Sequence, residues 1–189
     1  MPQIRSYEPR DKKAVQDICL ITSVGLDAEF KLQRHILACY CNYYLEKEPQ
    51  NCFVLTNDAD EAVGYILCAE NYFAYEESFT RIYLTQARCL GLKYYIESKA
   101  EIVAHRVFRN DFPSHLHINL LPEYQGKGYG TMLLDTLKAH LKAQGYSSLM
   151  LVCGTSNTGA INFYTKNGFV ELLRMDMKPI KGVAMGTVF

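Results

Sequence analysis

The sequence predicts an α/β protein, because patterns typical of strands and of helices alternate along the chain. The clearest case is HLHINLLPEYQGKGYGT at 115–131, where a strand-like run ends at Pro122 and glycines lead into a helical pattern. A second case is LMLVC at 149–153, a fully apolar run that is followed by a helical pattern and a β-rich run. In the N-terminal half, two helical patterns precede a pair of β-rich runs.

The length and charge of the chain limit what it can do. We expect a single domain over 1–189, because 189 residues can bury one hydrophobic core without disulfides or metal ions. Twenty basic and twenty acidic residues cancel, so no global field would attract nucleic acid or an anionic membrane. Binding is therefore expected at a local site, with neither nucleic acid nor membrane as a partner.

The cysteines and the N-terminus predict a soluble, cytoplasmic protein. The seven cysteines are odd in number and form no C-x-x-C pair, which argues against a disulfide framework or a zinc ribbon and favours reduced, buried thiols. The N-terminus lacks an apolar signal core, and no apolar run approaches the roughly 18 residues of a membrane span.

The first 70 residues are expected to form a strand, two helices and a hairpin. Apolar residues recur at helical spacing in both helical stretches, and Pro49 ends the second. The turn-forming NDADE separates two β-rich runs, which indicates a hairpin. The expected elements are an edge strand at 2–8, a helix after Pro9, a second helix from about Ala28 to Leu45, and strands at 52–56 and 62–70.

The region 72–113 is longer than a simple connection and carries helical patterns, so we expect a helical insertion there. Its tyrosines and carboxylates suit a pocket for a cationic amine. The alternative is a solvated, amphipathic helix pair. The side chains concerned are Tyr72, Tyr75, Tyr83, Tyr94, Tyr95, Glu76, Glu77, Glu97 and Glu101.

Downstream of the glycines, the pattern predicts a helix from about Gly128 to Gly145 that turns four leucines inward. Asn157 is placed to cap the next helix, which Gly168 ends, and FVELLRM starts another strand. The tail GVAMGTVF can supply a last strand, and that strand could pair across a homodimer.

The glycine turn predicts a site for a phosphorylated cofactor. Gly126, Gly128 and Gly130 permit backbone conformations closed to other residues and a close approach to the main chain. The first amides of the following helix lack intrahelical partners and lie at the positive end of its dipole, so they can hold a pyrophosphate. Neither a P-loop nor the dinucleotide fingerprint fits, whereas Q-x-x-G-x-G does.

With Gln125, Gly128 and Gly130, the turn resembles the signature of the GNAT superfamily of acetyl-CoA-dependent N-acetyltransferases. LMLVCGTSNTGAINFYTKNGF at 149–169 resembles the second signature of that superfamily. The resemblance implies the GNAT fold, a mixed, twisted sheet flanked by helices, with acetyl-CoA as co-substrate. The stretches HLHINLLPEYQ and VAMGTVF are similar to the acetyltransferase-like domain attached to O-GlcNAcases and to its free-standing bacterial relatives.

The resemblance also implies roles for individual residues. Main-chain groups of the central strand would face the pantetheine and thioester, and Asn157 would bond to the cofactor arm. The alternative for Asn157 is a helix cap alone. Tyr164 matches the tyrosine that protonates the departing thiolate, and its alternative is a packed aromatic ring. The implied cofactor-binding residues are Ile118, Asn119, Leu120, Gln125, Gly126, Lys127, Gly128, Tyr129, Gly130, Thr131, Asn157 and Tyr164.

A general base is needed because a protonated amine has no lone pair. Some GNAT enzymes carry a glutamate where this chain has Val152. The other candidates are His117, our first choice, and His115, both on one face of the central strand. Either histidine could instead be structural. They could also be two metal ligands, but no third is evident and we expect no metal.

The reaction implied is direct transfer of acetyl to a primary amine through a tetrahedral intermediate, without a covalent intermediate on Cys153. The acceptor would be a small amine, polyamine or amino sugar, with a peptide amine as the next candidate. A rival hypothesis is a non-catalytic binding or regulatory module with the same fold, which Val152 favours and the intact glycine turn opposes.

Overall fold

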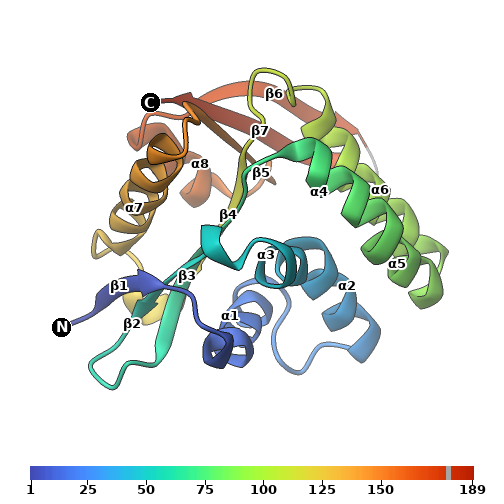
Figure 1. Ribbon diagram of the computed structural model, residues 1–189. Helices are drawn as coiled ribbons and strands as arrows, with labels where there is room; N and C mark the ends of the chain where they lie inside the picture. The colour runs from blue at the N-terminus through green and yellow to red at the C-terminus, as the bar shows by residue number, and fades with distance from the viewer. Residues whose placement is uncertain (178–179) are drawn as a thin grey trace. The chain divides into compact units, whose positions relative to one another are not determined.

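The computed structural model describes residues 1–177 and 180–189, and within them seven strands form one sheet in the order β1-β2-β3-β4-β5-β7-β6 (Figure 1). The chain divides into two compact units. The first contains 1–69 and 117–143, and the second contains 70–116 and 144–189. β4 pairs with β5 in parallel while the other recorded pairs are antiparallel, so the predicted α/β architecture with a mixed sheet is confirmed.

The first unit begins with β1 (Gln3–Ser6), which pairs with β2 of an antiparallel hairpin. That hairpin, β2 (Phe53–Thr56) and β3 (Ala62–Ala69), is buried throughout, which confirms the prediction. Three helices lie between β1 and β2: α1 (Lys12–Ser23), α2 (Phe30–Tyr40) and α3 (Asn42–Lys47).

The single helix expected from about Ala28 to Leu45 is two helices, so that part of the prediction is wrong. Cys41 leaves the helical region with φ −137° and ψ −59°, and α3 begins at the next residue. The physical reason is burial: at about 100° per residue, Tyr44 would lie on the opposite face of a straight helix from His35, yet both side chains are buried. The break changes the direction of the chain, so α2 and α3 each bury their own group of side chains.

The remainder of the first unit is the end of β4 (His115–Leu120), the turn η4 (Pro122–Tyr124) and α7 (Tyr129–Ala143). α7 packs against β2 and β3. It buries the four leucines that the sequence predicts: Leu133, Leu134, Leu137 and Leu141. Gly145, with φ +89°, follows the end of the helix as expected.

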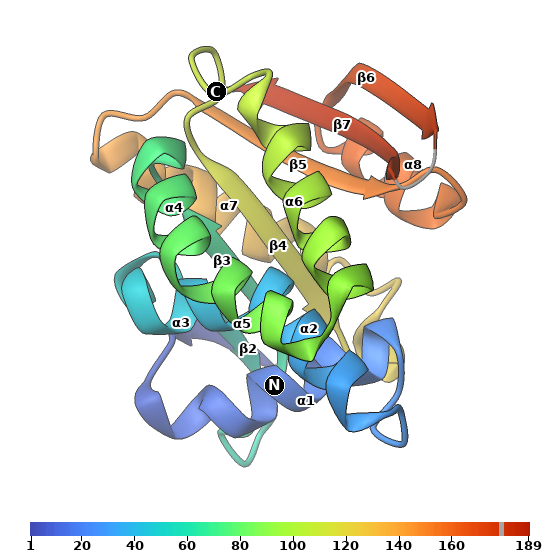
Figure 2. The same ribbon diagram turned by 90° about the vertical axis from the view of Figure 1, so that its right-hand side faces the viewer.

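The second unit combines helices with the C-terminal strands (Figure 2). β5 pairs with the start of β4 and with β7, and β7 also pairs with β6, so the last strand lies between two others. The elements are α4 (Tyr72–Ser78), the π-helical turn η3 (Phe79–Tyr83), α5 (Leu84–Leu90), α6 (Leu92–Arg106), β5 (Ser148–Gly154), α8 (Thr158–Lys166), β6 (Val170–Met177) and β7 (Ile180–Val188). The helical insertion before the central strand is confirmed.

Three of the tyrosines that were candidates for an amine pocket lie in the packed interior instead. Tyr72, Tyr75 and Tyr83 each expose 2% or less of their surface. The Tyr72 hydroxyl donates to the backbone oxygen of Ile102 at 2.6 Å. Burying these rings stabilises the unit, so they do not line an open pocket.

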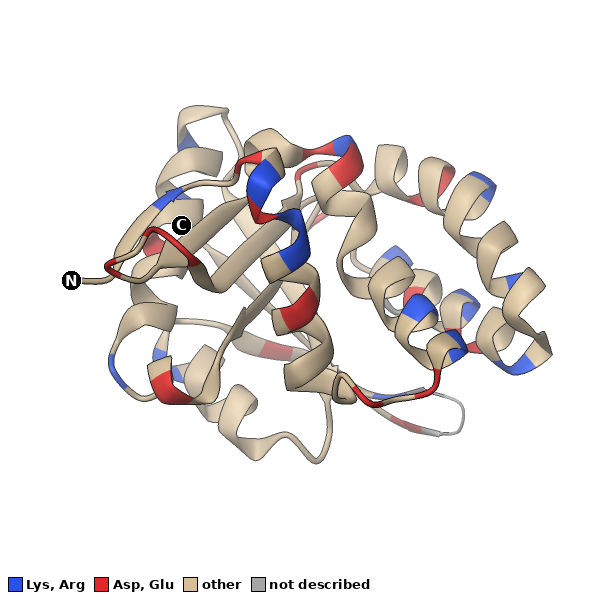
Figure 3. Cartoon of the chain, turned by 90° about the horizontal axis from the view of Figure 1, so that it is seen from below, with Lys and Arg blue, Asp and Glu red and all other residues tan. Residues whose placement is uncertain are grey.

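The surface and the cysteines agree with most of the expectations from composition. Acidic and basic residues are interspersed along the helices and loops (Figure 3). Five cysteines are buried, Cys153 is half-buried and Cys89 is exposed. The prediction that the cysteines are buried is therefore wrong for Cys89. In the part of the chain that the structure describes, no helix has both the length and the apolar composition to cross a membrane.

Candidate functional site

The glycine turn has the geometry that anion binding requires. Gly126 and Gly128 have φ of +70° and +85°, the left-handed region that favours glycine, and no heavy atom would lie within 4 Å of a Cβ at either position. α7 starts at Tyr129, so the amides of its first turn lack intrahelical acceptors. The turn therefore offers exposed donors at the positive end of a 15-residue helix.

Gln125 ties this turn to the end of β4. Its Nε2 donates to the backbone oxygen of Leu120 at 2.8 Å, and the Leu121 amide donates to the Val63 oxygen at 3.0 Å. Lys127 is exposed beside the turn, with Nζ 5.9 Å from the centre of the Tyr124 ring. The signature glutamine thus shapes the turn, while the lysine adds positive charge to it.

In β4, the residues Ile118, Asn119 and Leu120 are half-buried. A Cβ on Gly64 of β3 would lie 3.0 Å from Leu120 Cγ, so glycine allows the two strands to approach closely. Asn119 Nδ2 donates to the Tyr65 hydroxyl at 3.0 Å.

His117 lies among aromatic rings of the first unit. Its Nδ1 is 3.1 Å from the Tyr65 hydroxyl, and its ring stacks on Tyr40 and Tyr65 with centroids 5.3 Å and 5.9 Å away. His117 is half-buried as a residue, and burial lowers the pKa of its imidazole to about 4. The imidazole is therefore neutral near pH 7 and able to accept a proton.

His115 belongs to a different cluster, in the second unit. Its ring is 1% exposed and lies 4.4 Å from Tyr75 and 4.7 Å from His105, centroid to centroid. Burial, and then the neighbouring His105, hold the pKa of His115 well below its ordinary value. This environment suits a packed, neutral ring.

Tyr164 and Asn157 also lie in the second unit. Tyr164 is 7% exposed and packs against Phe163 and Phe169, at centroid distances of 5.2 Å and 5.4 Å. Burial, followed by the Cys153 thiol, raises the pKa of Tyr164 above its ordinary value of about 10, so the phenol keeps its proton at neutral pH. Asn157 is exposed, and its Oδ1 accepts from the Ala160 amide at 3.0 Å, which confirms the predicted helix cap.

Val152 stands where some GNAT enzymes carry a glutamate. The Val152 Cγ1 atom would lie 2.9 Å from a Cβ on Gly182, so this side chain packs on the backbone of β7. Burial raises the pKa of the half-buried Cys153 thiol, which makes it a poor nucleophile.

The structure therefore gathers the glycine turn, His117 and Asn119 in the first unit, and His115, Asn157 and Tyr164 in the second. Sequence reasoning missed Tyr65 and Tyr40 as neighbours of His117. One signal was available for Tyr65, because a tyrosine in an otherwise apolar strand needs a partner for its hydroxyl.

Comparison with known proteins agrees with the fold described above. The chain is similar to the crystal structure of SsHAT, at 26% identity over 99% of this chain and 98% of that chain, with a TM-score of 0.82. It shares the fold of the ribosomal-protein-S18-alanine N-acetyltransferase from Escherichia coli, at 18% identity, 100% and 94% coverage and TM-score 0.59. It also shares the fold of the PaiA N-acetyltransferase from Thermoplasma acidophilum in complex with coenzyme A, at 17% identity, 100% and 99% coverage and TM-score 0.60.

The model of the acetyltransferase (GNAT) family matches residues 22–169, which contain the whole glycine turn and the second signature. Most of the chain lies inside this match, and the resemblance to GNAT proteins is confirmed. The protein belongs to the acetyltransferase (GNAT) family.

Proposed function

We propose that this protein is an N-acetyltransferase that moves the acetyl group of acetyl-CoA to a primary amine. The observation that carries the proposal is the turn between β4 and α7, with open space over Gly126 and Gly128 and exposed amides at a helix start. Family membership adds support, and so does the CoA in the complex of the PaiA enzyme. The resemblance of two segments to the acetyltransferase-like domain of O-GlcNAcases suggests a subfamily.

Acetyl-CoA would be held mainly by main-chain groups. The amides from Gly126 to Thr131 would bind its pyrophosphate, and Lys127 would add a charge. The Gln125 amide already donates to the Pro122 oxygen at 3.1 Å, so Gln125 would serve by shaping the turn. Backbone groups of 118–120 would align the pantetheine and thioester, with Asn157 bonding to the arm. Because the Leu120 oxygen already accepts from Gln125, its neighbours in β4 are the better candidates for the thioester.

His117 is the proposed general base, and its low pKa fits a particular moment of the reaction. The amine reacts as the free base, because an imidazole with a pKa of about 4 is too weak to deprotonate an ammonium group. Its lone pair attacks, and the oxyanion that forms is stabilised by a backbone amide of β4. Attack makes the nitrogen strongly acidic, so a neutral imidazole with a pKa of about 4 can take the proton, directly or through water. His115 remains the second candidate, although its packing makes it less accessible.

Tyr164 is the proposed acid for the departing thiolate. Its raised pKa keeps the proton on the phenol, but makes full transfer to a thiolate of pKa about 8.5 uphill. We therefore infer that Tyr164 acts by donating a hydrogen bond to the sulfur while charge develops there.

The class of amine acceptor is proposed from chemical reasoning alone. A small amine, polyamine or amino sugar is our first proposal, and a peptide amine is second. One protein of similar fold, the S18-alanine enzyme, is named for a protein substrate, which keeps a peptide amine among the candidates. One scaffold serves many acceptors, so a panel of amines must decide.

Calorimetric titration with acetyl-CoA and with CoA tests the cofactor site. Gly128→Glu places a carboxylate over the turn and is expected to abolish binding. Gly145→Glu is the matched control, because Gly145 also has a positive φ, +89°, and open space around it. Both variants bear the same backbone strain, so only a blocked site separates them.

The outcomes of the titrations distinguish an active acetyltransferase from a non-catalytic module with the same fold. Binding lost in Gly128→Glu alone would justify screening amines for thiol release. No binding by the folded wild type would refute the proposal. Acetyl-CoA binding with no acetylation across a broad amine panel would favour the non-catalytic module.

A further inference from the structure

The His117 imidazole lies against the faces of two aromatic rings. The Tyr40 ring, from the end of α2, is 5.3 Å away between centroids and 21° from parallel. The Tyr65 ring, from β3, is 5.9 Å away and 30° from parallel. Both pairs are stacked, so the imidazole meets the π electrons of the two tyrosines. All three residues belong to the first unit.

Within the residues that the structure describes, the recorded contacts of this imidazole supply no negative charge. They are the two ring stackings and the Tyr65 hydroxyl, which lies 3.1 Å from Nδ1. Burial keeps the pKa of Tyr65 well above its ordinary value, so that hydroxyl stays neutral. A carboxylate beside a histidine commonly stabilises its charged form, and the recorded contacts of His117 include none.

Stacked π faces can stabilise the charged form instead. The face of an aromatic ring is the negative part of its quadrupole, and it attracts a cation that lies within about 6 Å of the ring centroid. Both stacking distances fall inside this limit. The attraction acts on the imidazolium and is far weaker for the neutral ring, so it favours uptake of a proton against the effect of burial.

We propose that Tyr40 and Tyr65 are positioning residues whose ring faces stabilise the positive charge that His117 acquires when it takes the proton of the attacking amine. The inference rests on the proposed function, since it assigns partners to the general base. In this step an N–H bond of the cationic nitrogen in the tetrahedral intermediate breaks, and its electron pair stays on that nitrogen. The proton binds a ring nitrogen of His117, directly or through water, and later leaves to bulk water.

Tyr40 is the better residue to test, because it is half-buried, whereas Tyr65 is fully buried and its hydroxyl has contacts of its own. Tyr40→Leu removes the π face, and Tyr40→Phe keeps it. Tyr7→Leu is the control, because Tyr7 is another half-buried tyrosine of the first unit and is not among the recorded contacts of His117 within the described residues.

NMR titration of the His117 ring in the ligand-free protein measures the effect without turnover. The wild type is expected to titrate with a pKa of about 4, and Tyr40→Leu should lower this pKa by about 0.4–1.5. Tyr40→Phe and Tyr7→Leu should leave it unchanged. Lost burial cannot imitate the result, because water that reaches the ring would raise the pKa. A pKa that stays the same or rises in Tyr40→Leu, or that falls equally in Tyr40→Phe, would overturn the inference.

Kinetics then test the consequence for turnover. Tyr40→Leu should lower kcat about 2- to 30-fold with the affinity for acetyl-CoA unchanged, whereas Tyr40→Phe should stay near the wild-type kcat. Equal kcat in Tyr40→Leu and Tyr7→Leu would contradict the positioning role. Absence of acetylation by the wild type would contradict the proposed function instead, while the NMR titration still decides whether the ring faces stabilise the charge.

Discussion

Tyr164 carries the mechanistic proposal at the scale of a single residue. Tyr164→Phe should lower kcat about 10²-fold or more, because the departing sulfur loses its hydrogen-bond donor, while acetyl-CoA affinity changes little. Rates at saturating substrate and calorimetric affinities measure the two effects separately. Tyr83→Phe, which removes another buried hydroxyl of the second unit, is the control and should leave kcat unchanged. Wild-type turnover in Tyr164→Phe would remove this residue from the mechanism.

Buried histidines should make stability depend on pH. Burial lowers the pKa of His105 and of His115, and lowers that of His117 to about 4. Below pH about 6.5 the unfolded chain binds protons that the folded chain refuses, so the free energy of unfolding falls as pH falls, by up to about 1.4 kcal/mol per pH unit for each histidine. Urea denaturation between pH 7 and pH 5 measures the slope.

The His115→Gln variant tests whether a histidine in the interior of the second unit contributes to this change of the free energy of unfolding with pH. His115→Gln removes one buried titrating ring, so its free energy of unfolding should change less steeply with pH than that of the wild type. Parallel slopes for the two proteins would show that His115 titrates alike in the folded and unfolded states, contrary to its packing.

Residue-scale features were predictable where they are local. The Asn157 cap spans three residues, and the sequence predicts it correctly. The bond between Tyr65 and His117 joins residues 52 positions apart, and it depends on how β3 lies beside β4, which no short pattern specifies. The roles of Tyr164, His117 and His115 in catalysis stay predictions.

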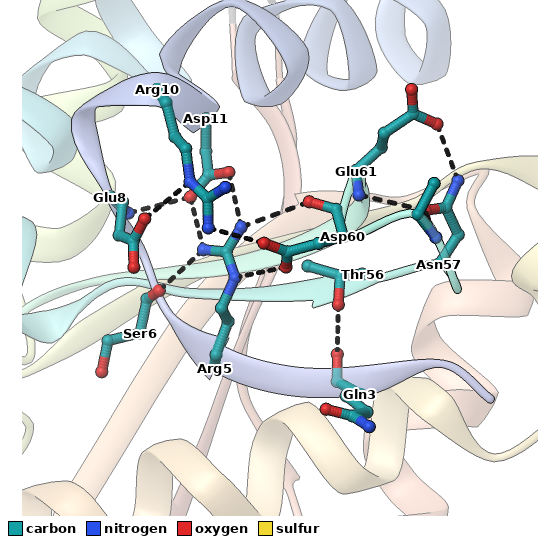
Figure 4. Close-up of polar contacts among 11 residues, drawn as sticks. Gln3, Arg5, Ser6, Glu8, Arg10, Asp11, Thr56, Asn57, Asp60 and Glu61 are labelled. Carbon is teal, nitrogen blue, oxygen red and sulfur yellow. Dashed lines mark hydrogen bonds and ion pairs between the residues drawn. The ribbon is translucent and has the colours of Figure 1, made fainter.

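At the scale of elements, an ion-pair network joins β1, the turn after it and the β2–β3 loop (Figure 4). Arg5 donates to both oxygens of the buried Asp11 at 2.7 Å and 2.9 Å, and its Nε donates to Asp60 at 2.8 Å. The Glu8 amide donates to Asp11 at 2.8 Å, and Arg10 donates to Asp60 at 2.6 Å. One carboxylate thus fastens the edge strand to the first helical turn.

Asp11→Asn should therefore destabilise the protein by about 1–3 kcal/mol, because a buried charge-assisted pair is lost. Burial raises the pKa of the Asp11 carboxyl, but hydrogen bonds from Arg5 and Glu8 outweigh it and hold the pKa below the ordinary value. The stabilisation is thus complete above pH about 3.9 and is lost as pH falls through the folded pKa. Urea denaturation measures it, with the exposed Asp58→Asn as a nearly neutral control. Equal effects of the two variants would exclude this role.

Elements whose apolar or turn-forming residues follow a regular pattern could be predicted from the sequence, and interruptions within a helix could not. The leucine spacing of α7 and the turn residues of the β2–β3 hairpin both correctly indicate their structures. The break at Cys41 has no glycine or proline to announce it, and the π-helical turn at Phe79–Tyr83 lies inside an unbroken helical pattern. The break at Cys41 follows from which side chains tertiary packing buries.

At the scale of the whole molecule, acetyl-CoA should stabilise the folded chain by mass action. A ligand at about 100 times its Kd adds about 2.7 kcal/mol, which raises the Tm of a chain of this size by roughly 5–11 °C. Thermal scans with and without acetyl-CoA check this. The shift should persist in Gly145→Glu and vanish in Gly128→Glu, and a shift retained by both would place the ligand elsewhere.

The overall architecture was predictable because two signature segments and their spacing specify the order of strands and helices around the turn. The position of β7 between β5 and β6 was not, because a terminal strand has no local pattern that selects its neighbours. The prediction of a single domain over 1–189 stays a prediction.

The division into two units has a consequence for how the gene can be cut and shuffled. The polypeptide passes from one unit to the other between Ala69 and Glu70, between Leu116 and His117, and between Ala143 and Gln144. Neither unit is therefore one contiguous stretch of the chain, and recombination cannot exchange either one as a contiguous cassette. Circular permutants that open the chain between Ala69 and Glu70 or between Ala143 and Gln144 keep every segment and cut no helix or strand, whereas the crossing after Leu116 lies inside β4.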